Sequence, residues 1–488
     1  MAIRQLLLHL IVLVVCAIGL VNPVIGLYGY VWYSLMRPDV LAWAEGMYPH
    51  SVTIAIITLL GVWRYVPNYI HWLRNPFVLL VLLLQVPILL SNVMAPYPHL
   101  AWEPYWRFTR ILLMCLMIPL FIQKLIDFHR LMLLMVGCLM FIGFKYGLFG
   151  LRMGGIHLDV GYGGFMSDNN TLAMALVMAL PMAWYARGIV EEKWAKTLLL
   201  GGCFFTIAAI VMSHSRAAAL TLGLVYLLIS FRSKYKLITL AIIVMLSFPA
   251  LYLVQDSFTK RMQTLENPEE EGSAAARIEY AKAAVRMWKD YPVFGVGFGT
   301  HNWVRISGVY LGHANMRRHV VHNNYLQMLV DSGTPALIIL CAQIFGGIWW
   351  LGKSARRMTR LFPGESKENY PIMLQMSLIA FAFCSIFASR TEYDFYYYLI
   401  MCCGCWWIVE KNELLPLAAH RAAEGATGAT AGEQTPRMAP SPVGTWQPAP
   451  AMVGPARTLR DADPQLTGPI PKGWRRPFTS SRLAKKES

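Results

Sequence analysis

Long apolar runs constrain this chain more than any other feature of its sequence. They are about 17 to 21 residues long and recur as far as about residue 409, and a helix of this length crosses the roughly 30 Å of hydrocarbon in a membrane. A spanning β-barrel would instead alternate apolar and polar residues, which runs such as 77–84 do not. With 56% hydrophobic and 14% charged residues among 488, the composition also excludes an ordinary water-soluble protein. The sequence therefore predicts an all-α polytopic membrane protein.

About twelve membrane helices are expected, joined mostly by short loops. The expected spans are 3–21, 52–66, 77–94, 108–123, 130–150, 171–187, 197–213, 217–231, 236–255, 336–352, 372–389 and 393–409. The first run follows a lone Arg4, and no small-x-small cleavage site follows it. We therefore interpret it as a membrane helix and not as a signal peptide.

Residues 23–36 are apolar and aromatic, but they form a stretch too short to cross a membrane alone. If they do not cross and the N-terminus is cytoplasmic, every basic loop lies inside, as the positive-inside rule requires. Counting the segment as a span would move the loops around Arg64 and Lys124 outside. We therefore predict a re-entrant or interfacial segment, with both chain termini in the cytoplasm.

The apolar pattern divides the chain into five regions. They are an N-terminal transmembrane region (1–170), transmembrane helices with a boundary arginine (171–255), a large, partly helical outer loop (256–335), C-terminal transmembrane helices (336–409) and a tail (410–488). The tail is rich in Ala, Gly, Pro and Thr and is predicted to be disordered in the cytoplasm. Basic residues cluster in short loops and in this tail, so the formal charge of +16 indicates topology and not nucleic-acid binding.

The cysteines and histidines do not predict a disulfide framework or a metal site. Nearly all nine cysteines lie in apolar runs, and the cluster at 402–405 has no His or carboxylate beside it. His313 and His319 are crowded by Arg317 and Arg318, which disfavours a zinc ligand set. We expect no metal and no cofactor.

Arg216 stands at a membrane boundary, in the sequence Ser213-His-Ser-Arg216 between two closely linked apolar runs. A boundary arginine can simply extend toward lipid headgroups. The functional alternative is phosphate binding, for which the rigid and permanently charged guanidinium is well suited. Both interpretations fit this position.

A second arginine lies in the large loop. The Ala-rich segment 273–288 predicts a helix, and helical spacing places Arg277, Ala281, Ala284 and Trp288 on one face. One charge within a small and aromatic face suggests an arginine turned toward a cavity near the membrane. A surface helix with ordinary solvated charges is the alternative.

Three alternate glycines follow this helix, at positions 295, 297 and 299. They permit tight turns or close backbone approach. Their spacing differs from the dinucleotide-binding fingerprint, and no strand-to-helix unit surrounds them. A nucleotide site is therefore not predicted.

His322 precedes a short amphipathic helix that is predicted to begin near Asn323 and to end before Thr334-Pro335. Helical spacing would put His322 on the face of Leu326 and turn it toward the membrane or the core. A histidine in such a place is either packed and hydrogen-bonded, or a proton acceptor at a site.

Taken in order, these motifs resemble the O-antigen ligase and O-antigen polymerase superfamily over about residues 165–409. The matching features are the polar stretch Ser167-Asp-Asn-Asn170, Ser-x-Ser-Arg216, Arg277 with Trp288 before Pro292-Val-Phe-Gly-Val-Gly, and His322-Asn-x-x-Leu-x-x-Leu-x-x-x-Gly333 before a span. Near the N-terminus, Asn22-Pro23 and Met36-Arg-Pro-Asp-Val-Leu-Ala-Trp43 are similar to the branch described as exosortase-associated O-glycosylation ligases.

The resemblance implies a glycosyltransferase of lipopolysaccharide biosynthesis at the periplasmic face of the bacterial inner membrane. Such a ligase moves a glycan from undecaprenyl diphosphate to a hydroxyl, with lipid A-core as the preferred acceptor. It implies catalytic roles for Arg216, Arg277 and His322, with inversion at the anomeric carbon and no metal. Secondary candidates for diphosphate or sugar contacts are Asn323, Arg305, Arg317, Arg318 and Arg390.

Three other functions stay open at this point. A polymerase would use the same donor but extend the carrier-linked chain, and a protein O-glycosylation ligase would use a protein hydroxyl. A transporter of lipid-linked sugars would predict internal repeats and broken helices near the midplane, and the sequence shows no convincing repeat. The sugar, the polymer length and the oligomeric state are not specified by the sequence.

Overall fold

The computed structural model describes residues 3–432 apart from 44, 45, 47, 154–159, 242–244, 246–273 and 313–318. Its α-helices are α1 (Ile3–Val21), α2 (Pro23–Met36), α3 (Pro38–Leu41), α4 (His50–Leu59), α5 (Tyr69–Leu73), α6 (Pro76–Met94), α7 (Pro98–Phe121), α8 (Leu125–Arg152), α9 (Asn169–Ala186), α10 (Lys193–Met212), α11 (Arg216–Arg232), α13 (Ala274–Asp290), α14 (His301–Ile306), α15 (Asn324–Cys341), α16 (Gly347–Leu361), α17 (Asn369–Cys384), α18 (Asp394–Val409) and α19 (Leu415–Gly432). Short 3-10 or π segments are Val62–Asn68, Ser307–Val309, Ala342–Gly346 and Glu410–Leu414. One antiparallel hairpin, β1 (Val160–Gly163) with β2 (Met166–Asp168), precedes α9.

Most of these helices are apolar, and the protein is an all-α, multi-pass membrane protein. Five described helical stretches are long and apolar enough to cross a membrane: α1, α6, α8, α10 and the continuous run from Asn324 to Leu361. Large apolar side chains on their outer surfaces, such as Leu6, Leu83 and Leu198, are exposed, as lipid-facing residues are. The count of twelve spans remains a prediction, and its 236–255 span lies mostly outside the described residues.

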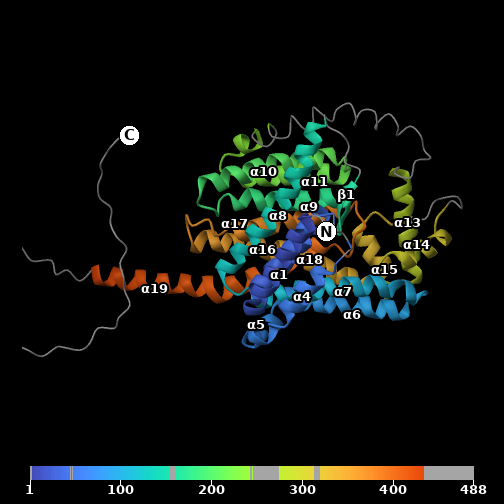
Figure 1. Ribbon diagram of the computed structural model, residues 1–488, viewed down its shortest axis with the longest axis horizontal. Coiled ribbons are helices and arrows are strands. Elements are labelled where there is room, and N and C mark those ends of the chain that lie inside the picture. The colour runs from blue at the N-terminus through green and yellow to red at the C-terminus, as the bar shows by residue number, and fades with distance from the viewer. Residues whose placement is uncertain are drawn as a thin grey trace, which may run out of the picture. The chain divides into compact units, whose positions relative to one another are not determined.

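The core is centred on α9 and α18, which are apolar on all sides. Fourteen residues of α9 are buried, and α18 buries nearly every residue from Phe395 to Val409. A helix that is hydrophobic all round belongs inside a bundle. The two helices pack together with α17 and α8, and Figure 1 shows the remaining helices arranged around them.

Residues 23–36, expected to be a re-entrant or interfacial segment, form the continuous helix α2. It lies antiparallel to α4, because Pro23 is next to Gly61 while the Tyr33 hydroxyl is 3.2 Å from His50 Nδ1. It therefore runs alongside α4 over its length. Small residues make this packing possible, since a Cβ on Gly26 would lie 2.5 Å from Thr58 Oγ1.

The two ends of α1 lie beside different segments, so the N-terminus is at the end of α1 away from Arg64. Gln5 donates to the carbonyl of Trp43, whereas Arg64 donates to the carbonyls of Leu20 and Val21. Helix α1 thus begins beside the segment after α2 and ends beside the basic segment after α4. The sequence prediction placed the N-terminus with the basic loops, because residues 23–36 were judged too short to cross and the positive-inside rule then favoured a cytoplasmic N-terminus.

The beginning of the predicted disordered tail is also helical. A π segment follows α18, and α19 extends to Gly432. Alanine favours helix, which explains why this Ala-rich part of region 410–488 continues the helix. Residues 433–488 of the tail lie outside the described residues.

The part of the loop that is described forms a small packed unit. Helices α13 and α14 lie together near the ends of α6, α7 and α15 (Figure 1). Buried Ala284, Met287 and Trp303 contribute to its own hydrophobic cluster. The cluster fixes α13 against α15, so any residue on the adjoining face of α13 has a defined position.

A kink at Gly333 receives the glycine-rich segment. Gly333 has φ 79° and ψ −179°, a conformation that is essentially restricted to glycine. The kink frees backbone carbonyls, and Val296 and Gly297 donate to Val330 and Asp331 oxygens at 2.8 and 2.9 Å. The close backbone approach predicted for the alternate glycines is confirmed, and the expected break before Thr334 is this kink.

Candidate functional site

The turn between α10 and α11 presents Arg216 as the first residue of α11. The Ser213 hydroxyl accepts from the Ser215 amide at 3.2 Å, and the Ser215 side chain caps α11 by accepting from the Ala218 amide at 3.4 Å. Asn169 adds a third constraint, because its side-chain amide donates to the Ser213 carbonyl at 2.9 Å. The position of Arg216 is therefore defined by both serines and by the start of α9.

Helix α13 presents Arg277 on the face that the spacing predicted. One end of this face is packed, since Ala284 is buried and the Trp288 indole donates to Thr334 Oγ1 at 2.9 Å. Ala281 and Arg277 follow toward the N-terminus of α13. The burial of Ala284 and the bond from Trp288 confirm that this face of α13 turns toward α15 and not toward open solvent.

His322 lies just outside α15 and does not share its helical spacing. Its backbone is left-handed, with φ 59°, and Asn323 is the cap whose side chain accepts from the Tyr325 and Leu326 amides at 3.0 Å each. The predicted helix start is confirmed, but the helical argument for the direction of His322 was wrong. The imidazole is partly buried and stacks on His319 with a centroid distance of 4.7 Å.

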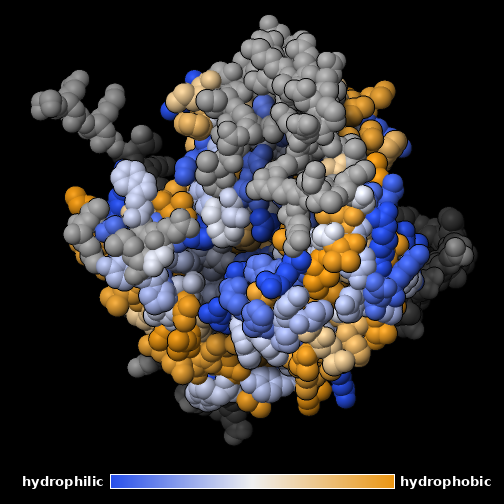
Figure 2. Space-filling view, turned by 90° about the vertical axis from the view of Figure 1, so that its right-hand side faces the viewer, coloured by the Kyte–Doolittle hydropathy of each residue, from blue (hydrophilic) through white to orange (hydrophobic). Residues whose placement is uncertain are grey.

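One pocket of about 310 Å³ is lined by all three predicted catalytic residues. Its lining consists of Arg216, Arg277, Ile278, Ala281, Val321, His322, Asn323, Ile386 and Phe387. These residues come from α11, α13, the segment before α15 and the segment after α17, which are far apart in the chain. The face on which α13 and α14 lie has hydrophilic residues gathered in its middle, with hydrophobic residues to both sides (Figure 2). The pocket lining therefore combines polar side chains from three separate segments, Arg216, Arg277 and His322-Asn323, with the apolar side chains of the remaining lining residues.

Charge in the pocket comes from two guanidinium groups. Arg277 is exposed, yet surrounding protein displaces part of its water, and this desolvation together with the charge of Arg216 lowers its pKa. No described residue forms an ion pair with either arginine. Two cations that repel one another would both be stabilised by a bound anion.

His322 is neutral at physiological pH. Burial lowers its pKa to about 4, with further lowering by Arg277 and His319 and partial opposition from Asp168. A neutral imidazole can accept a proton. The described residues contain no group of three or more His, Cys, Asp or Glu side chains placed to hold a metal ion.

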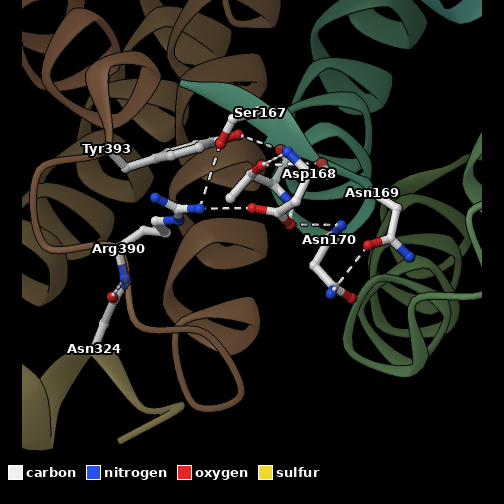
Figure 3. A network of polar contacts seen from close by, with 8 residues as sticks. Ser167, Asp168, Asn169, Asn170, Asn324, Arg390 and Tyr393 are labelled. Atoms are coloured by element: carbon white, nitrogen blue, oxygen red, sulfur yellow. Dashed lines mark hydrogen bonds and ion pairs between the residues drawn. The ribbon is translucent and has the colours of Figure 1, made fainter. Parts of the chain in front are cut away.

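The secondary candidates lie in different places. Asn323 lines the pocket, but its side-chain oxygen caps α15. Arg305 lies over the Tyr97 ring, 4.4 Å from its centroid, and does not line the pocket. Arg390 does not line it either, because its guanidinium donates to Asp168 Oδ2 at 2.6 Å (Figure 3). Arg317 and Arg318 lie outside the described residues.

Sequence reasoning missed the wall formed by Ile386 and Phe387. These residues belong to a segment that the sequence assigned to the end of a span, and no local pattern distinguishes them from lipid-facing residues. Asp168 was quoted only as part of a polar stretch. Its charge acts on His322, although 154 positions separate the two residues in the sequence. No sequence-spacing rule predicts an electrostatic interaction over such a separation.

Two family models match the chain. The model described as O-antigen ligase matches residues 201–341, the region that contains Arg216, Arg277 and His322. A family of unknown function (DUF5935) matches residues 3–190. No curated protein matches the chain. The O-antigen ligase match spans all three pocket residues and supports the O-antigen ligase superfamily for this chain.

Proposed function

We propose that the protein is an O-antigen ligase, which transfers a glycan from undecaprenyl diphosphate to a hydroxyl of lipid A-core. The observation that carries this proposal is the convergence of Arg216, Arg277 and His322 on one pocket. The match to the O-antigen ligase family supports a ligase or polymerase type of function in general. Donor, acceptor and stereochemistry are part of the proposal.

The two arginines would bind the diphosphate. When the acceptor oxygen attacks the anomeric carbon, the bond to the diphosphate breaks and negative charge develops on the leaving group. Guanidinium groups held in place before the reaction stabilise this charge without reorganisation. Their mutual repulsion in the empty pocket is relieved by the same anion, so the arrangement favours a bound diphosphate and needs no added metal ion.

His322 would accept the proton of the acceptor hydroxyl as the new glycosidic bond forms. Its low pKa in the free protein keeps it neutral and ready to accept. A diphosphate between Arg277 and Arg216 offsets the charge that lowers this pKa, so the basicity of His322 increases when the donor binds. One displacement on one face of the sugar inverts the anomeric centre.

The apolar walls would hold the first isoprene units of the carrier. Ile278 and Ala281 are shared with a neighbouring pocket of about 450 Å³, which is also lined by Lys282, Val285, Arg286 and Leu326. An apolar surface that is continuous with a cationic site suits a ligand with a diphosphate head and a hydrocarbon tail.

The site would face the periplasm of a bacterial inner membrane, where lipid-linked glycans and lipid A-core meet. The basic segments at the opposite end, around Arg64, Lys124 and Arg232, would then lie in the cytoplasm. In this orientation the N-terminus is periplasmic, because it lies at the same end as Trp43 and away from Arg64.

The test uses purified protein, undecaprenyl-diphosphate glycan and lipid A-core, with EDTA present. Wild type is compared with Arg216→Ala, Arg277→Ala and His322→Ala. Lys289→Ala is the matched control, because Lys289 is a cation on the same helix as Arg277 and lines neither pocket. We expect glycolipid product from wild type and control only.

Each other outcome overturns a defined part of the proposal. Longer carrier-linked chains without modified acceptor would show a polymerase. Transfer to a protein hydroxyl in place of lipid A-core would show a protein O-glycosylation ligase. Loss of product on adding EDTA would contradict metal-independent catalysis, and equal activity in all five proteins would contradict the site.

A further inference from the structure

An ion pair near the pocket, but outside its lining, joins the start of α9 to the segment that follows α17. Arg390 Nη2 is 2.6 Å from Asp168 Oδ2 and 3.4 Å from Ser167 Oγ. Both partners are partly exposed, at 41% and 37% of their side-chain area. An ion pair at such exposure contributes little to stability, so its position is better explained by what each partner contacts.

The same segment holds the start of α15, next to His322. The Arg390 backbone amide donates to the side-chain oxygen of Asn324, and the Asn323 amide donates to Ser389 Oγ at 3.1 Å. The Asn324 backbone amide also donates to the Ser385 carbonyl at 2.8 Å. His322 directly precedes these two asparagines. The segment 385–390 therefore fixes the backbone position from which the His322 side chain extends.

The Asp168 carboxylate, which is the partner of Arg390, is also held by hydrogen bonds. Asp168 Oδ1 accepts from the Asn170 and Thr171 amides at 2.9 and 3.0 Å and so caps α9. The remaining oxygen, Oδ2, is the one that Arg390 holds. The next residue, Asn169, donates to the Ser213 carbonyl in the turn before Arg216. Figure 3 shows Arg390 reaching toward Asp168 from one side while Asn169 and Asn170 extend on the other.

We propose that Asp168 and Arg390 are a positioning pair, which fixes the location of His322 relative to Arg216 and sets the charge that the imidazole experiences. This inference rests on the proposed function for its catalytic meaning. It assigns neither residue to direct substrate contact, and it replaces the substrate-binding role predicted for Arg390.

Asp168 and Arg390 affect the pKa of His322 in opposite directions, because of the charged and titratable groups that surround this histidine. Arg277 on α13 and His319 on the same loop disfavour the imidazolium, and Asp168 at the start of α9 favours it. Arg390 neutralises part of the charge of Asp168 through their ion pair. Removing Asp168 therefore lowers the pKa of His322, whereas removing Arg390 leaves Asp168 uncompensated and raises it.

The experiment measures this directly on the full protein, without donor or acceptor. Hydrogen–deuterium exchange at the imidazole Cε1 of His322 is followed by mass spectrometry of its peptide from about pH 2.5 to pH 8, a range that extends below the wild-type pKa of about 4. The variants are Asp168→Asn, which keeps a capping side chain, and Arg390→Gln. Arg390→Lys tests rescue, and Arg130→Gln is a control that breaks the exposed pair with Asp127, 3.4 Å apart.

We expect the exchange midpoint to move to lower pH in Asp168→Asn and to higher pH in Arg390→Gln. Arg390→Lys and Arg130→Gln should keep the wild-type midpoint. Shifts in the same direction, or no shift in either variant, would overturn the pair, because a purely structural role gives no opposite signs. Transfer assays should show kcat reduced in Asp168→Asn and Arg390→Gln, by up to about 10²-fold, the scale for a catalytic group displaced by about 1 Å, and unchanged in Arg130→Gln.

The two proposals fail in distinguishable ways. If wild type transfers no glycan but the midpoints shift as expected, the proposed function fails and the pair stands as a device that controls His322. If transfer occurs and depends on His322 while the midpoints do not move, the function stands and the pair is refuted.

Discussion

The imidazole rings of His319 and His322 are stacked, with centroids 4.7 Å apart and ring planes at 17°. His319 is itself held, since its Nδ1 accepts from the Val320 amide at 3.0 Å and its carbonyl accepts from the Trp303 indole at 2.8 Å. The hydrogen-bonded ring therefore serves as a fixed surface for the other. The stacking therefore indicates different roles for the two histidines: His319 supports the ring of His322.

Replacing His322 should have a much larger effect than replacing its neighbour. His319→Phe preserves a ring that can stack, and we expect transfer within about threefold of wild type. His322→Ala removes the proton acceptor, a loss of about 10²- to 10⁴-fold in kcat for general base catalysis. Steady-state kinetics with saturating donor would check this, and equal losses in the two variants would contradict the assignment of the base to His322.

The two pocket arginines should contribute to the transition state more than to donor binding. Removing Arg277 or Arg216 leaves the leaving-group charge without one of its partners, so kcat/KM should fall about 10²- to 10³-fold. The double variant should lose less than the product of the two single losses, because both groups act on one diphosphate. Strictly multiplicative losses would show that the arginines act at separate sites.

The pH dependence of transfer should differ between kcat/KM and kcat. Neutral His322 is the active form, so activity is lost as pH falls through its pKa, which is about 4 in the free protein. The profile of kcat/KM follows the free protein, whereas kcat follows the donor complex, in which the bound anion offsets Arg277 and raises the pKa. The acid limb of kcat should therefore lie at higher pH. Coincident acid limbs would rule out this coupling.

Glycine at position 333 should be required for folding. A Cβ there would lie 1.9 Å from the Val293 carbonyl oxygen, in a backbone conformation that other residues avoid. Gly333→Ala should lower stability by about 3 kcal/mol or more, or prevent folding altogether. Thermal unfolding of the detergent-purified protein checks this. Gly137→Ala is the control, because no atom lies within 4 Å of the added Cβ.

Local patterns predicted the parts of the site that are set by local chemistry. The turn before Arg216, the face of α13 and the cap at Asn323 each follow from residues within one or two helical turns. Side chains that cap or pack locally leave a signature in the sequence. These motifs, together with the family resemblance, selected Arg216, Arg277 and His322, but not the apolar residues Ile386 and Phe387 that complete the pocket.

Contacts between distant segments left no such signature. The pair of Asp168 and Arg390 spans 222 positions. Helix α2 illustrates a different difficulty, because 14 residues rise only about 21 Å and fall short of the usual span length. The positive-inside rule was then applied without α2 as a span. The packing of α2 beside α4, with Pro23 next to Gly61 and Tyr33 bonded to His50, is a contact that neither helix length nor loop charge reports.

The left-handed backbone at His322 affects which amino-acid substitutions are favourable at this position. A non-glycine residue there costs roughly 1–3 kcal/mol, and Asn tolerates this conformation better than His does. A chain with Asn at this position would thus gain stability and lose its proton acceptor together. A screen of random variants for thermal stability would therefore favour replacements of His322 that abolish activity. Thermal stability and catalytic activity are opposed at this one residue.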